Sequence, residues 1–225
     1  MSSMSMAKRF LVIGGTGRTG RHIVRKLHGG GHVVRVLTRG GQALANAEIV
    51  RGDITDAGRV QVAMQQIDGV IVVVESADDD HAPNSPERVH YYGIRNVVAA
   101  ADQRRPHILL VTQIYITRPD RYPEVRNVIY WRGRAEEALH TSGLPYTVVR
   151  PSWLMEKVGG QNGIRLEQGD TGEGYVARED VAEVCVQGLL HEESRGKTFE
   201  VYNEPGTPPK DWTAAFAALH TDAHM

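Results

Sequence analysis

Cysteine and long hydrophobic runs are both scarce in this 225-residue sequence. With a single cysteine, Cys185, the chain cannot form an internal disulfide or a metal site built from several thiolates. Cys185 falls in a helical pattern, where a lone cysteine acts as a small buried hydrophobe. No apolar run approaches the roughly 20 residues that a membrane-spanning helix needs. The sequence therefore predicts no membrane partner.

Net charge is also nearly absent, because 26 lysine and arginine residues stand against 27 aspartate and glutamate residues. This balance gives no support for general binding to nucleic acid or to an anionic membrane. No carboxylate precedes Glu48, whereas the basic residues before it are Lys8, Arg9, Arg18, Arg21, Arg25, Lys26, Arg35 and Arg39. We interpret Arg21, Arg25 and Lys26 as a solvated helix face. The positive N-terminal part otherwise suits the phosphates of a nucleotide.

The start of the chain lacks the pattern of a secretory signal. Residues 1–8 carry no apolar stretch ahead of their basic residue, and the apolar run 10–13 is too short for a signal-peptide core. We therefore expect a cytoplasmic protein in which residues 1–8 form a flexible leader. A length of 225 residues predicts one domain, 1–225, rather than two.

Apolar strand-like runs alternate with helical patterns along most of the chain. The expected strands are 9–14, 32–38, 48–51, 69–75, 107–112, 146–150 and 198–202, and the expected helices are 17–27, a segment capped near Asp56, 86–104, 128–142, 180–190 and 211–219. This order predicts the α/β class: a Rossmann fold with a doubly wound parallel sheet and helices on both faces. After Pro151 the pattern loosens, so we expect 151–225 to form a small C-terminal cap on the substrate side that includes the closing helix.

The segment Gly14-Gly15-Thr16-Gly17-Arg18-Thr19-Gly20 follows the first expected strand and opens the first helix. A helix N-terminus carries about half a positive charge and unpaired N–H groups, so glycines that bring backbone close to it create a diphosphate site. A G-x-x-G-x-x-G match is weak by itself, but its place in a βαβ unit favours this interpretation over an ordinary strand-to-helix turn. We predict that the residues from Gly14 to Thr19 bind a dinucleotide.

The second strand ends without the acidic residue that selects NAD. NAD sites place Asp or Glu about 20 residues past the loop, where the carboxylate accepts hydrogen bonds from the ribose 2′-hydroxyl and repels a 2′-phosphate. This chain has Thr38 and Arg39 there instead. With Arg18, Arg39 offers a second guanidinium suited to bidentate phosphate contact. We therefore predict NADP(H) over NAD(H), the alternative being two exposed arginines beside a permissive ribose pocket.

Five segments form a pattern whose order and spacing are specific: IGGTGRTG at 13–20, VRGDITD at 50–56, GIRNVVAAA at 93–101, AEEALHTSGLPYTVVRP at 135–151 and REDVA at 178–182. The pattern resembles atypical short-chain dehydrogenases/reductases of the NAD(P)H-binding group, which includes NmrA-like and biliverdin/flavin-reductase-like proteins. The resemblance implies that three pairs of residues lie at the cofactor: Asp53 and Ile54 beside the adenine, Glu75 and Ser76 in the cleft, and Pro151 and Ser152 near the nicotinamide. Strand ends at the carboxyl edge of a sheet are also where open α/β folds bind ligands.

One feature of that group is missing, namely a tyrosine followed four residues later by a lysine. The chain contains no Tyr-x-x-x-Lys, and the flanking segments put Val128 and Arg132 at these two positions. Tyr130 with Arg134 keeps the spacing two residues later, which turns both side chains by about 200° around the helix. Only a shifted helix start would bring Tyr130 to the expected face.

Three residues remain as catalytic candidates: Thr112, Tyr130 and Arg132. Thr112 takes the place of the strand-end serine of the group, although it also fits the simple end of a strand. Arg132 could supply positive charge to the ribose or to the substrate. It cannot relay a proton, because arginine stays protonated in proteins.

These features leave three hypotheses for the function. The first is a reductase that moves hydride from NADPH to a small organic acceptor, with a proton from solvent, Tyr130, Thr112 or the substrate. The second is a non-catalytic NADPH-sensing regulator or assembly factor, which the loss of the Tyr–Lys pair beside an intact loop would suit. The third, an isomerase or dehydratase, needs a base that we cannot locate. We favour the reductase.

Two further expectations concern metals and assembly. The cluster Asp78, Asp79, Asp80 and His81 fits a solvated loop better than a metal site, so we assign no metal. Base rates alone favour a homodimer as the oligomeric state.

Overall fold

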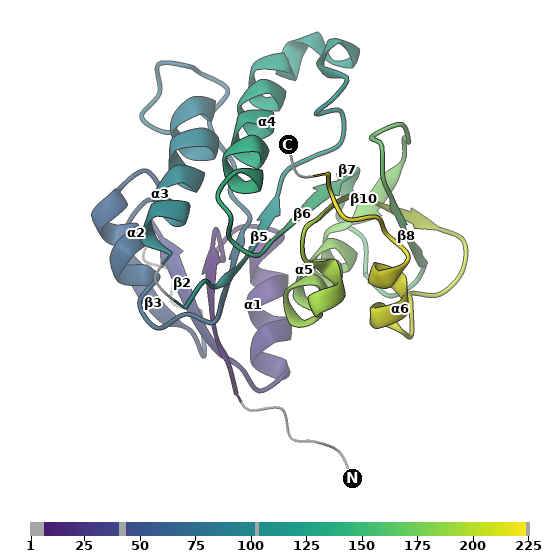
Figure 1. Ribbon diagram of the computed structural model, residues 1–225, viewed down its shortest axis with the longest axis horizontal. Coiled ribbons are helices and arrows are strands. Elements are labelled where there is room, and N and C mark those ends of the chain that lie inside the picture. Colours follow the sequence, from purple (N-terminus) through teal and green to yellow (C-terminus); the bar gives the residue numbers. More distant parts are fainter. Residues whose placement is uncertain (1–6, 41–43, 102–103, 224–225) are drawn as a thin grey trace.

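A large, mostly parallel sheet forms the centre of the computed structural model, which describes residues 7–40, 44–101 and 104–223. Its strands are β1 (Arg9–Ile13), β2 (Val33–Thr38), β3 (Glu48–Arg51), β4 (Gly69–Val72), β5 (His107–Val111), β6 (Tyr146–Pro151), β8 (Gly163–Glu167) and β10 (Lys197–Glu204). Their order is β3-β2-β1-β4-β5-β6-β10-β8 (Figure 1), and all neighbours are parallel except β10 and β8. The predicted doubly wound α/β fold is confirmed.

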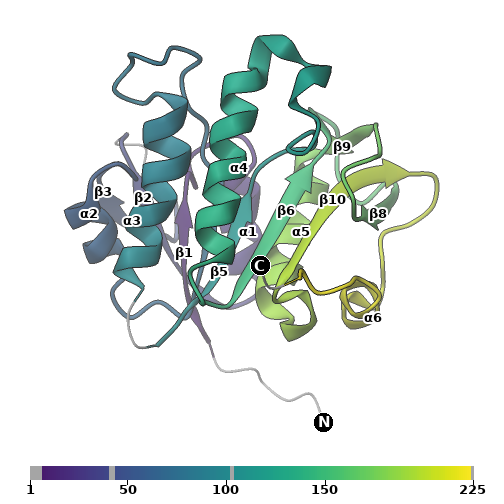
Figure 2. The same ribbon diagram turned by 45° about the horizontal axis from the view of Figure 1, so that its top comes forward.

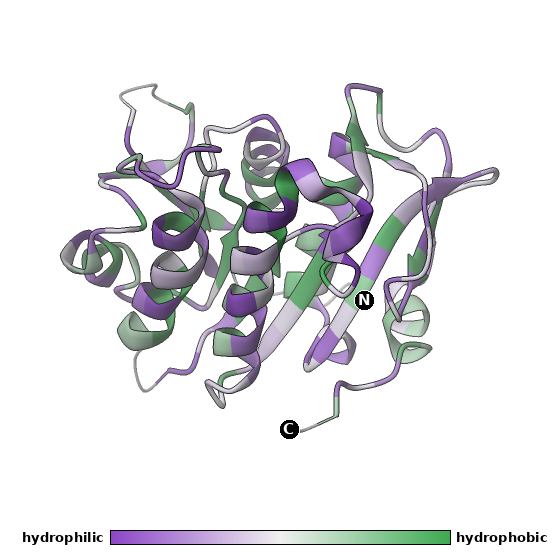
Figure 3. Cartoon of the chain, turned by 90° about the horizontal axis from the view of Figure 1, so that it is seen from above, coloured by the Kyte–Doolittle hydropathy of each residue, from purple (hydrophilic) through white to green (hydrophobic). Residues whose placement is uncertain are grey.

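Helices cover both faces of this sheet (Figure 2). One face carries α1 (Gly20–Gly29), α5 (Arg178–Leu190) and α6 (Trp212–Ala217), and the other carries α2 (Ala57–Ala63), α3 (Gly93–Ala100) and α4 (Arg126–His140). Figure 3 shows hydrophobic colour on the central strands and hydrophilic colour on much of the outer helix surface. Because central strands are covered on both sides, β1 and β4 consist almost wholly of buried apolar residues. No helix in the described part of the chain has the length and apolarity to cross a bilayer.

Local sequence signals account for the buried face of α1 and for the start of α2. The predicted face of α1, with Ile23, Val24 and Leu27, is buried against the sheet. The predicted cap at Asp56 is also confirmed, since an Asp56 side-chain oxygen accepts a hydrogen bond from the Arg59 N–H at 3.1 Å. The helix expected over 86–104 differs, because it begins with a π-helical segment, Glu87–Tyr92, before α3. Such wider turns occur frequently beside functional sites.

The C-terminal part is more ordered than its sequence pattern indicates. Within the stretch that we expected to be loose, the structure forms β8 and also β7 (Trp153–Met155) and β9 (Tyr175–Ala177), which pair in parallel. Glycines turn the chain between these strands, as Gly169 shows with φ of +103°, a region that favours glycine. We did not predict these three strands, because they are too short or too mixed in polarity to show a clear period.

The topology also fixes where a ligand can bind. From β3 at one edge the chain crosses back to β4, which lies on the other side of β1. The strand order therefore reverses between β1 and β4, and the loops that follow these strands diverge. In open α/β sheets this opening at the carboxyl ends of the strands is the usual ligand site.

Candidate functional site

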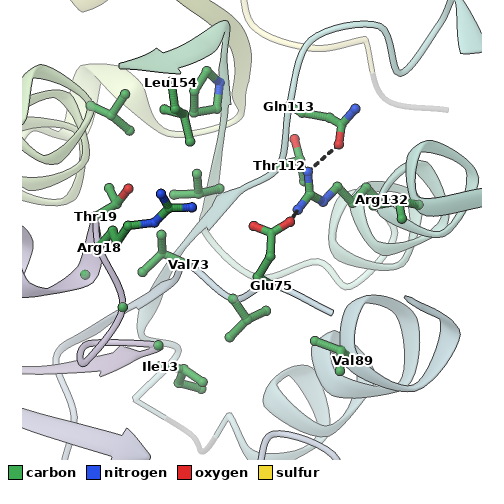
Figure 4. Close-up of a pocket in the computed structure, with 18 of the residues that line it drawn as sticks. Ile13, Arg18, Thr19, Val73, Glu75, Val89, Thr112, Gln113, Arg132 and Leu154 are labelled. Carbon is green, nitrogen blue, oxygen red and sulfur yellow. Dashed lines mark hydrogen bonds and ion pairs between the residues drawn. The ribbon is translucent and has the colours of Figure 1, made fainter. Parts of the chain in front are cut away.

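A cavity of about 690 Å³ opens at that point, along the carboxyl ends of β1, β2, β4, β5 and β6. It brings most of the predicted site residues together: Gly14, Thr16, Gly17, Arg18, Thr19, Arg39, Asp53, Ile54, Glu75, Thr112, Arg132, Pro151 and Ser152 all line it. Three other predicted residues, Gly15, Ser76 and Tyr130, are not among the lining residues. The phosphate loop and Arg132 lie on opposite sides of the cavity (Figure 4).

Two glycines allow the loop after β1 to fold tightly against its neighbours. Gly14 has φ of +89°, and a Cβ there would collide with the carbonyl oxygen of Val73. A Cβ on Gly20 would collide with the carbonyl oxygen of Gly14. Gly15 has a different role, because a Cβ there would crowd the side chains of Val36 on β2 and Val24 on α1. The loop geometry therefore depends on glycine at these positions.

The same loop presents unused hydrogen-bond donors beside the N-terminus of α1. The backbone N–H groups of Thr16, Arg18 and Thr19 have no acceptor within the described ranges. The first turn of α1 contains no acidic residue, and the Thr19 side chain does not cap it. Free donors and an uncompensated helix dipole suit a negatively charged group. The residues present therefore fit the diphosphate of a dinucleotide.

Arg18 and Arg39, which we expected to act together on one phosphate, bind different carboxylates in this structure. Nη1 of Arg18 lies 3.3 Å from Oε1 of Glu156, whereas Nε of Arg39 lies 3.5 Å from Oδ2 of Asp53. Only Arg39 therefore lies beside Asp53, the residue that the resemblance places at the adenine. Both arginines line the cavity, and their joint contact with a 2′-phosphate stays a prediction.

Arg178 is a cavity residue that we did not predict. Its Nε donates to Oε1 of Glu156 at 2.6 Å, and its Nη1 lies 3.4 Å from Oγ1 of Thr19 in the loop. The hydrogen bond from Arg178, followed by the charges of Arg178 and Arg18, lowers the pKa of Glu156. Arg178 is the first residue of the segment REDVA, which belongs to the pattern recognised in the sequence. That pattern did not indicate that Arg178 contacts Glu156 and Thr19.

The far side of the cavity is dominated by Arg132 (Figure 4). This side chain is only 9% exposed, and its guanidinium donates to the side-chain oxygens of Glu75 and Gln113. Val128 also lines the cavity. Tyr130 instead points away, with 55% of its surface exposed and its ring packed edge-on against Trp131. The geometry therefore brings Arg132 to the site and leaves Tyr130 outside it.

Thr112 connects the cavity to a buried ionic network. Its hydroxyl donates to Oε1 of Glu136 at 2.6 Å, and Glu136 also accepts from Nε and Nη2 of Arg150 at 3.1 and 2.6 Å. Nη1 of Arg150 then reaches Glu200 at 3.1 Å, and Glu200 accepts the Asp170 N–H at 3.0 Å. Because its proton is committed to Glu136, the Thr112 hydroxyl faces the cavity as an acceptor.

Burial and the neighbouring charges act in opposite directions on the pKa values in this network. It raises the pKa of Glu200, an effect that the Asp170 N–H and Arg150 oppose. Burial would lower the pKa of Arg150, but the charges of Glu136, Glu200 and Asp170 outweigh it and raise the value. We did not predict Glu136, Arg150 or Glu200 as site residues. The position of Glu136 could have been inferred, because it lies four positions after Arg132 and therefore shares a helix face with it.

The network also fixes Tyr115, another cavity residue that we did not predict. Oδ1 of the fully buried Asp170 accepts the Tyr115 N–H at 2.6 Å and so holds this residue in the left-handed region, at φ of 73°. Burial and the neighbouring Tyr122 raise the pKa of Tyr115 to about 12. The buried Tyr115 hydroxyl and the Ser152 hydroxyl have no hydrogen-bond partner in the described part of the chain. Both residues belong to the cavity wall.

Comparisons with known proteins agree with this geometry. Residues 14–192 match the model of a family described as NAD(P)H-binding. The chain is 29% identical to sanguinarine reductase of Eschscholzia californica over 98% of this chain and 99% of that protein. It is 29% identical to the photosystem II assembly factor Ycf39 of Synechocystis, over 86% of this chain and 62% of that protein. A Veillonella parvula short-chain dehydrogenase/reductase of wide type, solved in complex with NADP, has the same fold, with a TM-score of 0.71 and 16% identity over 92% of this chain and 100% of that chain.

Proposed function

Because this chain belongs to the NAD(P)H-binding family, we propose that it is an NADPH-dependent oxidoreductase that reduces a small organic acceptor. The observation that carries the proposal is that one cavity holds both the open phosphate loop and, opposite it, the buried cation of Arg132 beside Thr112. An anion-binding end and a separate polar chamber are what a dinucleotide and a second small molecule require. The similarity to sanguinarine reductase supports the same assignment.

Different residues around the cavity would bind different parts of the cofactor and the acceptor. The loop N–H groups would bind the diphosphate, Arg39 would bind the adenosine end, and the residues around Thr112 would bind the nicotinamide end. The bound cofactor supplies a hydride there. Arg132 would place a fixed positive charge at the acceptor end of the cavity, and it keeps its own proton while doing so. Water would deliver the proton, so no tyrosine acid is needed at the position of Val128.

Turnover with a panel of acceptors tests this proposal. Purified protein saturated with NADPH is mixed with quinones, flavins, aldehydes and enones, and the absorbance of the reduced nicotinamide is followed. Oxidation that depends on both protein and acceptor supports the reductase. If NADPH binds tightly and no acceptor in the panel is reduced, the reductase proposal fails.

Cofactor preference depends on Arg39 in this proposal. Arg39→Ala is expected to weaken NADPH binding by about tenfold and to leave NADH binding nearly unchanged, because one charge-assisted contact to the 2′-phosphate is lost. Titration of nicotinamide fluorescence with both cofactors measures the ratio. Arg18→Ala is the matched control, since Arg18 reaches Glu156 rather than the adenine side and should affect both cofactors alike. An unchanged NADPH-to-NADH ratio in Arg39→Ala would refute NADPH selectivity through this residue.

A second candidate function is a non-catalytic one, namely an NADPH-sensing regulator or an assembly factor. The absence of a Tyr-x-x-x-Lys pair and the relative that is an assembly factor favour it. It requires a protein partner whose affinity differs between the NADPH-bound and cofactor-free states. Equal affinities in both states would exclude sensing. For either function we propose a cytoplasmic location, which fractionation of cells would check.

A further inference from the structure

Arg132 binds two side chains from other elements on its side of the cavity. It projects from α4, while Glu75 follows β4 and Gln113 follows β5, and the guanidinium donates to an oxygen of each (Figure 4). The two ends of the ion pair differ sharply, because the Arg132 side chain is 9% exposed and the Glu75 side chain is 77% exposed. A buried cation is therefore neutralised by a carboxylate that lies in solvent.

This difference makes Glu75 an exchangeable partner. A buried guanidinium needs a counter-charge, and Glu75 is the carboxylate that pairs with Arg132 in the described ranges. Glu75 itself loses little when it turns into water, because its side chain is already largely hydrated in the pair. Burial, followed by the charge of Arg132, holds the pKa of His90 well below its usual range, so His90 stays neutral and adds no second cation.

Apolar side chains line part of the cavity that Arg132 faces. Val89, Val128 and Leu154 line the cavity, and the buried Nε of Arg132 has no hydrogen-bond partner in the described part of the chain. Gln113 is neutral and holds one edge of the guanidinium, so Arg132 stays in place when Glu75 leaves. Such a site combines a fixed positive group with an apolar wall.

We propose that Arg132 binds an anionic group on the acceptor, a carboxylate or a phosphate, in exchange for Glu75. The substrate class is thus a conjugated, mostly apolar acceptor with one negatively charged group. The inference rests on the proposed reductase function. For a quinone of this class, hydride from NADPH and one proton from water give the hydroquinone and NADP⁺, so atoms and electrons balance.

A matched pair of acceptors tests the charge preference. A naphthoquinone with a propionate side chain and its methyl ester share the same reactive ring and differ in one remote charge. Wild-type protein should show a KM for the propionate about tenfold lower than for the ester, the effect of one charge-assisted hydrogen bond. Glu75→Gln should lower the KM for the propionate further, by about threefold, and more than for the ester. Equal KM values for the two acceptors in wild-type protein would overturn the inference.

Variants of α4 separate this role from a structural one. Arg132→Gln should remove the preference for the propionate, and Arg132→Lys should retain part of it because the charge remains. Arg134→Gln is the control on the same helix, because Arg134 is partly exposed and pairs with Glu137 instead. If Arg132→Gln weakens NADPH binding and affects both acceptors equally, Arg132 serves the cofactor and the inference is wrong.

A binding measurement keeps the inference separate from the proposed function. Naphthalene propionate and its methyl ester cannot be reduced by hydride, so calorimetric titration into the NADPH-saturated protein measures recognition alone. Tighter binding of the propionate that Arg132→Gln abolishes supports the anion site even if no acceptor is ever reduced. Equal binding of acid and ester, combined with normal turnover of quinones, refutes the anion site and leaves the reductase standing.

Discussion

Replacing Gly20 with alanine is expected to weaken NADPH binding by at least about a hundredfold. The new Cβ would collide with the carbonyl oxygen of Gly14, so the loop must move away from the N-terminus of α1. The free N–H groups of Thr16, Arg18 and Thr19 then lose their common direction. Each hydrogen bond to a charged group contributes about 1.5 to 3 kcal/mol, and a loss of two accounts for a factor of about a hundred or more. Titration of nicotinamide fluorescence measures the effect.

Gly29→Ala is the matched control at the other end of the same helix. A Cβ at Gly29 meets nothing within 4 Å, so this variant should bind NADPH like the wild type. Thermal unfolding of both variants separates a local loop change from a global loss of structure. If Gly20→Ala melts near the wild type and still binds NADPH within about threefold of its affinity, the loop is not the diphosphate site.

Much of this loop and its helix could be predicted because the signals are local. Glycine spacing, the cap at Asp56 and the buried face with Ile23, Val24 and Leu27 each depend on residues only a few positions apart. The rotation that removes Tyr130 from the cavity also follows from helix geometry alone. The alternation of strands and helices likewise predicts a parallel sheet, although it does not give the order of the strands.

The contacts that could not be predicted join residues far apart in the chain. Arg18 was expected to act with Arg39, but its partner Glu156 lies 138 residues away in the sequence. The short strands β7 and β9 have three residues each and show no readable period. A charged residue inside a predicted buried strand, such as Arg150, does indicate a buried counter-charge. The sequence alone cannot say that Glu136 and Glu200 provide it.

Arg150→Met is expected to destabilise the protein by about 3 to 5 kcal/mol at pH 8. The change leaves Glu136 and Glu200, both nearly inaccessible, without their shared cation, and an uncompensated buried charge is costly. For a chain of this size the melting temperature should fall by about 6 to 20 °C. Arg165→Met is the matched control, because Arg165 also pairs with two glutamates but is 42% exposed. Its loss should cost about 1 kcal/mol or less.

The pH dependence of the Arg150→Met variant identifies the cause of this loss. Burial raises the pKa of Glu200 above its usual 4.5, and removal of Arg150 takes away a charge that opposes this rise. In the window between 4.5 and the raised pKa of Glu200 the folded state binds more protons than the unfolded state, so stability falls as pH rises. The difference between wild type and variant should therefore shrink when denaturant unfolding is repeated at pH 5. A loss of equal size at both pH values would mean that lost packing, rather than unpaired charge, destabilises the variant.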